Sequence, residues 1–300
     1  MIPLNTIDVS HINSEFSSLD SEATLDQLIE LFKKDHDVYI FQNETYLGCV
    51  TEHDLMGHDG DEVVSSISTF VNPQPVITLD TPFHEAARII LNHRTHSVGV
   101  NDKDGDFIGV VSDKILIANL DGEDMALIDY MSSNLVTISD KTNITQAIDL
   151  LRANKISRIP VIDDNFDIIG LLSSHNILEL FLDTSSTEQN KDQICVSDIM
   201  NSSPVLATEF QTLSDAAKLM IDRNTYAVVV VRTDTKIPIG IITITDLLEN
   251  LSIEPAQEGY QVKVIGDYDE SVLEYLVEES LSLVSKFAYF MGGSGKVIKL

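Results

Sequence analysis

Two pairs of side chains in the sequence combine a hydroxyl with a carboxylate three residues later. They are Thr51 with Asp54 and Thr243 with Asp246, and each pair directly follows an apolar run. A carboxylate offers only hydrogen-bond acceptors, so it can take both hydroxyl donors of a ribose diol. A hydroxyl residue at a helix N-terminus can bind phosphate, because free backbone N–H groups and the helix dipole favour an anion. The spacing therefore indicates chemistry suited to a phosphorylated ribose.

Two further places carry a related but incomplete pair. Ser112 precedes Ile115, which has no carboxylate, so ribose capture is not expected there. Ser173 precedes Asn176, which keeps an acceptor without its charge. All four hydroxyls would also serve as helix N-caps with no ligand at all, because a hydroxyl accepts readily from a free N–H of the next turn. The capping interpretation therefore stays open beside the binding one.

The hydroxyl positions recur because the chain is internally repeated. Four glycines, separated by 61, 61 and 70 residues, each lie in an apolar strand that leads to the hydroxyl and a helix start; they are Gly48, Gly109, Gly170 and Gly240. We number the repeats one to four after these glycines. Such self-similarity is the first feature to seek in a sequence, because it decides the whole architecture.

Repeat three shows most clearly the elements that position these groups. Apolar residues at helical spacing begin at Ile144, and Ile159 to Ile162 form a short apolar run. Asp163 to Asp167 is a polar turn before the strand that holds Gly170. This pattern predicts strand, helix, strand, turn, strand and helix. Strands and helices alternating at this density predict an α/β class.

At this point the pattern resembles the CBS (cystathionine-β-synthase-type) domain. The resemblance rests on a Pro-Val strand followed by a Gly-apolar-apolar-Ser/Thr-x-x-Asp segment, seen best in SRIPVIDDNFDIIGLLSSHNIL of repeat three, and it covers residues 9–250. It implies an α/β (α+β) fold of four β-α-β-β-α repeats in two pseudo-symmetric pairs, at 1–122 and 123–252. Two units of this family pack sheet to sheet, with clefts that bind AMP, ADP, ATP or S-adenosylmethionine.

The resemblance also implies which residues share a cleft. In the family, the Asp motif of one repeat faces the Pro-Val strand of the other repeat in its pair. Asp246 would then hold the ribose, Thr243 and Arg158 the phosphate, and Pro160 and Val161 would wall the base. The SRIP order is similar to the phosphate-binding strands of the γ subunit of AMP-activated protein kinase. An arginine can form a charge-assisted fork to phosphate oxygens.

A second cleft would lie in the first pair. There the resemblance joins Thr51 and Asp54 to His96 and Ser97. This cleft lacks a fixed positive charge at the strand position, so we expect it to bind more weakly.

A possible metal cluster needs separate consideration. Glu52, His53, His58, Asp59 and Asp61 lie close together in the sequence, but their spacing does not match a tetrahedral site. A solvated helix end explains them better, so we expect no metal, no required cofactor and no catalytic residues.

The overall charge limits the partners. The chain has 48 acidic and 19 basic side chains, a formal net charge of −29. Such a field repels nucleic acid and anionic membrane, and a phosphorylated ligand then needs local basic groups. Two cysteines, no signal-like N-terminus and an apolar stretch at 227–248 interrupted by charges predict a reducing, cytoplasmic setting without a membrane span.

The last segment, 256–300, predicts a strand, a helix and a strand. It faintly resembles the start of the ribosome-hibernation factor fold, although it is acidic where that family is basic. Three functions stay open at this stage. They are a non-catalytic sensor of an adenosyl ligand that signals to an unknown protein partner, an interaction or ribosome-associated factor acting through 256–300, and a regulatory subunit of a separate enzyme. We also expect a homodimer, because apolar helix faces remain on an acidic chain.

Overall fold

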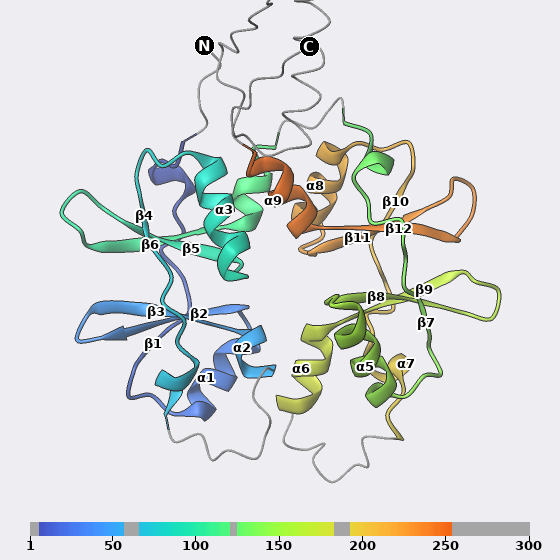
Figure 1. Ribbon diagram of the computed structural model, residues 1–300, viewed down its shortest axis with the longest axis horizontal. Coiled ribbons are helices and arrows are strands. Elements are labelled where there is room, and N and C mark those ends of the chain that lie inside the picture. The colour runs from blue at the N-terminus through green and yellow to red at the C-terminus, as the bar shows by residue number, and fades with distance from the viewer. Residues whose placement is uncertain (1–5, 57–65, 121–124, 183–192, 254–300) are drawn as a thin grey trace, which may run out of the picture.

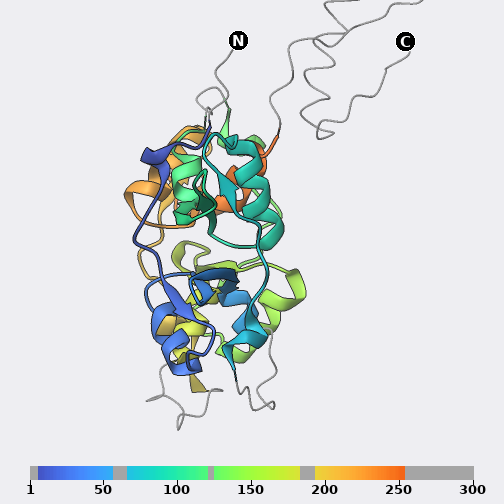
Figure 2. The same ribbon diagram turned by 90° about the vertical axis from the view of Figure 1, so that its left-hand side faces the viewer.

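The computed structural model describes residues 6–56, 66–120, 125–182 and 193–253. In Figure 1 these residues form four small units at the corners of a flat disc, and Figure 2 shows the disc from its edge. Each unit is one sequence repeat. The prediction for 256–300 and the expected boundary between the pairs near 122 lie outside the described residues.

Every repeat has the same order of elements. Repeat one holds β1 (Ser18–Asp20), α1 (Leu25–Phe32), β2 (Asp37–Gln42), β3 (Thr45–Thr51) and α2 (Glu52–Met56). Repeat two holds β4 (Ile77–Thr78), α3 (Phe83–His93), β5 (Ser97–Asn101), β6 (Phe107–Ser112) and α4 (Asp113–Ile117). Repeat three holds β7 (Ile138–Ser139), α5 (Ile144–Asn154), β8 (Arg158–Ile162), β9 (Ile168–Ser173) and α6 (Ser174–Leu182). Repeat four holds β10 (Leu206–Thr208), α8 (Leu213–Asp222), β11 (Ala227–Val231), β12 (Pro238–Thr243) and α9 (Ile244–Leu251).

Short helical turns precede the repeats. They are η1 (Val9–His11), η2 (Ile67–Phe70), η3 (Leu127–Asp129) and α7 (Val196–Ile199). In each repeat the first strand runs parallel to the second, across the intervening helix, and the second pairs antiparallel with the third. A parallel pair needs such a crossover, whereas the antiparallel pair is closed by a tight turn. The predicted α/β class is confirmed. Within the described part of the chain, no helix is both long and apolar enough to cross a membrane.

The repeated hydroxyls begin helices, as the sequence predicts. Ser112 caps α4 by accepting from the Ile115 backbone N–H, and Thr243 caps α9 in a reciprocal capping box with Asp246. Capping boxes satisfy two helix-end donors at once, so they fix where the chain turns from strand to helix. Local capping therefore places each hydroxyl at the same point of its repeat.

The repeats of a pair exchange their leading segments. The segment before each repeat forms an isolated antiparallel bridge with the third strand of its pair mate; the bridges are Asn13–Val110, Cys49–Asn72, Ser132–Ile241 and Leu171–Asn201. The repeated glycine lies next to each bridge. A Cβ atom on Gly48 would lie 2.4 Å from the carbonyl oxygen of Asn72, and one on Gly109 would lie 2.6 Å from that of Asn13. In the first pair the glycine leaves space for the exchanged backbone, whereas at Gly170 and Gly240 the nearest atoms belong to methionine side chains of the exchanged segment.

Sheet-to-sheet packing completes each pair. Between repeats one and two, Phe16, Tyr39 and Phe107 form part of an aromatic cluster, with ring centroids 5.4–5.7 Å apart. The Tyr39 hydroxyl donates to Ser97 Oγ at 2.9 Å, which satisfies its polar end inside the interface. Between repeats three and four the contact is aliphatic, with Leu171 in one cluster with residues of β11 and β12.

Helices join the two pairs unequally. One apolar cluster spans repeats two and four, where α3 and α4 pack on α9, and it includes Ile90, Leu116 and Leu247. The clusters of repeats one and three are separate, and on that side α2 approaches α6. The disc therefore forms within one chain. These internal contacts bury the apolar helix faces on which the expected homodimer depended, so the homodimer stays a prediction.

Alanine at equivalent repeated glycines should destabilise the fold by different amounts, because the glycines face different neighbouring atoms. In Gly48→Ala the new methyl group meets main-chain atoms of Asn72, so the free energy of unfolding should fall by about 1–3 kcal/mol. In Gly240→Ala the methyl group meets only the flexible side chain of Met131, so the loss should be smaller. Urea denaturation of both variants measures the difference. Equal losses would contradict the backbone explanation.

Candidate functional site

The four repeats meet around a central cavity of about 610 Å³. Its lining is polar and includes charged, imidazole and amide side chains from all four repeats; among them are Asp37, His96, Asp113, Lys114, Arg158, Ser173, His175, Asn176 and Tyr226. Several of these side chains lie at the start of the second strand or of the last helix of their repeat. The β-α-β-β-α order thus brings the same parts of four repeats to one place.

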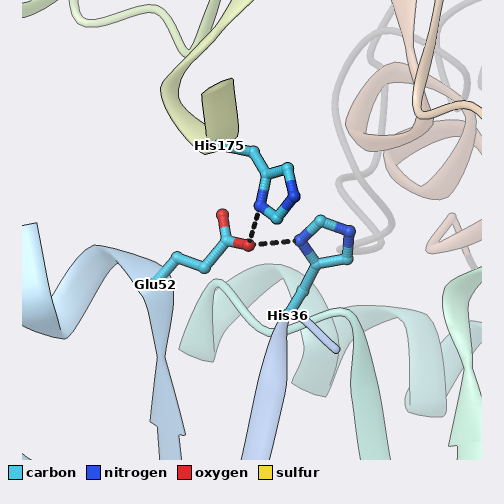
Figure 3. A group of neighbouring side chains, drawn as sticks. All are labelled: His36, Glu52 and His175. Carbon is cyan, nitrogen blue, oxygen red and sulfur yellow. Dashed lines mark hydrogen bonds and ion pairs between the residues drawn. The ribbon is translucent and has the colours of Figure 1, made fainter. Parts of the chain in front are cut away.

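A carboxylate with two histidines links repeats one and three. Glu52 Oε1 lies 2.6 Å from Nδ1 of His36 and 2.6 Å from Nδ1 of His175 (Figure 3). Burial would raise the pKa of Glu52, but hydrogen bonds from His175 and His36 outweigh it and hold the pKa at about 2. Glu52 is thus a carboxylate that can only accept, so both Nδ1 atoms donate. The same bond raises the pKa of His175.

A second polar cluster holds His96 and Ser97, two of the four residues predicted for the first cleft. The backbone N–H of His96 and the hydroxyl of Ser97 both donate to Oδ2 of Asp37, at 2.7 Å, and His96 Nδ1 lies 2.6 Å from Asp113 Oδ2. Burial raises the pKa of Asp37 to about 6. Its Oδ1 is buried with no partner among the described residues. Neither His96 nor Ser97 hydrogen-bonds the Thr-Asp pair of repeat one in the described structure.

The ring of Tyr226 lies close to two cationic side chains and two imidazole rings. The guanidinium carbon of Arg158 is 5.8 Å from its ring centroid, and Lys114 Nζ is 4.0 Å away. The rings of His36 and His96 lie 4.7 and 4.6 Å from the same ring. Sequence reasoning missed Lys114, because it lies in repeat two, whose motif lacks the carboxylate. Only the tertiary structure brings Lys114 beside Arg158.

The predicted site of repeats three and four keeps one oxygen of Asp246 outside the capping box. The backbone N–H and hydroxyl of Thr243 both donate to Asp246 Oδ2 at 2.7 Å. Oδ1 of Asp246 accepts neither of these two bonds. Burial raises the pKa of Asp246, and Arg158 is close enough to act against that rise. A carboxylate oxygen next to an arginine could accept from a ribose hydroxyl.

The equivalent motif of repeat one differs in one contact. Asp54 Oδ2 accepts from Thr51 N and Oγ1 at 2.8 and 2.7 Å, but its Oδ1 also accepts from Asn72 Nδ2 at 2.6 Å. Both oxygens are engaged, so a ribose would have to displace Asn72. The lack of a fixed positive charge at the strand position of this cleft stays a prediction. Arg94, at the C-terminal cap of α3, has its Nη1 3.2 Å from Nε2 of His53, the residue before Asp54.

The remaining predicted site residues lie in the core of repeat three, in its sheet and at the cap of α6. Val161 is fully buried in the core of repeat three, so its side chain cannot wall a base, and only its backbone can face a ligand. Pro160 alternates with it and points to the other face of the sheet. Ser173 and Asn176 line the cavity and cap α6, with Ser173 Oγ donating to Asn176 Oδ1 at 2.8 Å.

In the sequence, Glu52 forms a group of possible metal ligands together with His53, His58, Asp59 and Asp61. His53 is exposed and faces Arg94, and 58–61 lies outside the described residues. The structure instead groups Glu52 with His36 and His175, from segments distant in the sequence. No local spacing signal could have found that group.

A comparison with family models agrees with this geometry. The CBS domain model matches residues 64–122, 127–183 and 196–253. The chain belongs to the CBS domain family. Repeat one lies outside the matched residues, yet its sheet and helices follow the same order as the other three. The CBS resemblance seen in the sequence is confirmed.

Curated relatives carry the same domain, and a solved structure has a similar fold. A CBS domain-containing protein of Dictyostelium discoideum is 34% identical over 128 residues, covering 40% of this chain and 87% of the relative. CBSX2 of Arabidopsis thaliana is 29% identical over 140 residues, covering 38% of this chain and 58% of CBSX2. Its structure in complex with AMP covers 42% of this chain and 94% of its own chain, with a TM-score of 0.36. Protein MJ1225 of Methanocaldococcus jannaschii covers 80% of this chain and 98% of its own, with a TM-score of 0.65 and 14% identity.

The carboxylate–histidine bridge predicts a pH dependence of stability. Because the pKa of His175 is raised in the folded state, protonated His175 stabilises the fold fully below its ordinary pKa of 6.5. This stabilisation is lost as the pH rises through the pKa of the folded state. Because the pKa of Glu52 is lowered in the folded state, its carboxylate stabilises the fold fully above its ordinary pKa of 4.5. This stabilisation is lost as the pH falls towards 2. Glu52→Gln should therefore lower the free energy of unfolding by about 1.5–3 kcal/mol near pH 5.5 and by less at pH 9. Urea denaturation in EDTA measures this, and an equal loss at both pH values would contradict the ionic bridge.

Proposed function

We propose that this chain is a non-catalytic regulatory module. It binds an adenosyl ligand between repeats three and four and passes the bound state to a partner protein. The ligand is AMP, ADP, ATP or S-adenosylmethionine, as the family resemblance implies. The observation that carries the proposal is that Thr243 engages only Oδ2 of Asp246, which leaves Oδ1 outside the capping box, while Arg158 acts on the charge of Asp246.

Charge supports a phosphate at the centre of the disc. At a net charge of −29, a nucleotide is repelled unless fixed cations stand at its phosphates. Arg158 and Lys114 both line the central cavity. Asp246 does not itself line this cavity, but the charge of Arg158 acts on it, so a ligand held by Asp246 would need to extend into the cavity to place its phosphates at these cations. Charge-assisted bonds to them are the strong kind, since one partner is always ionised.

The position of Arg158 also suggests how the bound state is passed on. Arg158 belongs to repeat three, and its charge interacts with Glu52, Asp113 and Asp246, one from each of the other repeats. A phosphate on Arg158 would compete with these carboxylates. Binding would thereby change the electrostatic contacts among all four repeats, and a protein on the disc surface would sense the change. This role includes the regulatory subunit of a separate enzyme.

Two further expectations belong to the same proposal. We propose a cytoplasmic location and a homodimer of 33.2 kDa chains. No described residue favours the ribosome-associated alternative, since it depended on 256–300.

Binding measurements test the proposed site. Calorimetric titration with AMP, ADP, ATP and S-adenosylmethionine should find at least one ligand. Asp246→Asn and Arg158→Ala should each weaken nucleotide binding by about 10–100-fold, because a hydrogen bond to a charged group contributes about 1.5–3 kcal/mol. Adenosine separates the two roles: it should respond to Asp246→Asn but not to Arg158→Ala, since it has no phosphate.

Matched controls exist in the same chain. Thr212 and Asp215 form the same capping box at the start of α8, so Asp215→Asn loses a cap without touching the site. Arg152→Ala removes an exposed arginine from α5. Both should bind like wild type. Wild-type protein that binds none of the four ligands would disprove the proposal, and a loss seen only in Asp54→Ala would move the site to the first pair.

A further inference from the structure

Three potential metal ligands converge where the two pairs face each other. One ligand atom each from His36, Glu52 and His175 lies within 4.8 Å of the others. They come from the residue before β2, the first residue of α2 and the N-terminal turn of α6 (Figure 3). Two belong to repeat one and the third to repeat three. We propose that these residues bind Zn²⁺ or a chemically similar divalent cation and so clamp the pairs together.

The donor set selects the class of cation. Two imidazole nitrogens with one carboxylate oxygen suit zinc and neighbouring transition metals, whereas Mg²⁺ and Ca²⁺ prefer oxygen ligands alone. Three protein ligands leave a fourth position for water. Because His36 and His175 line the central cavity, that position can be reached from it. The strongly acidic chain also raises the local concentration of cations.

The present geometry is close to what zinc requires. Bonds of about 2.0–2.2 Å in a tetrahedral site place ligand atoms about 3.3–3.6 Å apart. Both Nδ1–Oε1 distances are 2.6 Å, so each must lengthen by about 0.7–1.0 Å. Zinc would replace the two protons that Glu52 Oε1 now accepts. His175 Nε2 also lies 3.5 Å from Glu179 Oε1, an outer carboxylate of the kind that orients zinc-bound histidines.

The fold gives this cation a mechanical role. Repeats two and four share one apolar cluster, but the clusters of repeats one and three are separate. On the weaker side α2 approaches α6, and these two helices carry Glu52 and His175. A metal bound there would hold together the side that has no shared apolar cluster. Binding would then stabilise the folded chain by mass action.

Zinc titration tests the site without any nucleotide. The full chain is treated with EDTA, the chelator is removed, and ZnCl₂ is titrated by calorimetry near pH 7.5. One Zn²⁺ should bind with micromolar or tighter affinity and raise the Tm. Loss of an outer-shell partner usually weakens metal binding by about 10–100-fold. His36→Ala and His175→Ala each remove a direct ligand, so each should weaken zinc binding by more than that.

The chain supplies a matched control. His53 follows Glu52 on α2 but is exposed and faces Arg94, so His53→Ala should bind zinc like wild type. Should an alanine variant not fold, Glu52→Gln keeps the size of the side chain and removes the carboxylate. The inference is overturned if wild type binds no zinc at micromolar concentration, or if the ligand variants bind as tightly as His53→Ala. Because zinc is titrated with no nucleotide present, failure here is distinguishable from failure of the nucleotide site.

Discussion

The exchanged backbone bridge beside each repeated glycine is the contact on which the rest of the structure depends. It ties the segment before one repeat to the last strand of its pair mate, and it does so four times. A single repeat of three short strands has little apolar surface to bury alone. The exchange makes two repeats one folding unit, and their sheets then pack face to face. The helices at the inner ends of the pairs are positioned only as a consequence.

Unequal packing follows from this arrangement. Repeats two and four merge their apolar helix faces, whereas repeats one and three meet through polar side chains around Glu52. Apolar contact is non-directional and tolerates small shifts, but a buried carboxylate must keep its donors. The polar side is therefore the more sensitive to ligands, protons and cations. Both proposed ligands act at or near it, through Arg158 in one case and His175 in the other.

The charge distribution explains how an acidic chain can keep a site for an anion. The cavity lining balances Asp37 and Asp113 against Arg158 and several imidazoles, two of which bind Glu52 behind them. Each described carboxylate of this group has a nitrogen donor or a cation nearby, which offsets the cost of its burial. A phosphate that enters would compete for the same cations. In the proposed function, ligand binding would be coupled to the contacts between repeats through these shared charges.

The sequence alone determined what is local. The periodicity of apolar residues predicted the alternation of strands and helices, and the three-residue spacing of Thr243 and Asp246 predicted the cap that the structure contains. The repeated glycine revealed the repeats and their family, although its reason, the backbone of Asn72 or Asn13, was not visible. These features depend on neighbours along the chain, which a sequence displays directly.

The tertiary structure decided which distant side chains meet. His175 is 123 residues from Glu52, and Lys114 and Arg158 come from different pairs, so no spacing rule links them. The sequence grouped Glu52 with its neighbour His53, but a residue next along a helix points in another direction. The sequence likewise could not show that Asn72 donates a hydrogen bond to Oδ1 of Asp54, whereas Thr243 leaves Oδ1 of Asp246 out of its bonds. Contacts between repeats are set by how the pairs pack, and that packing is a property of the whole fold.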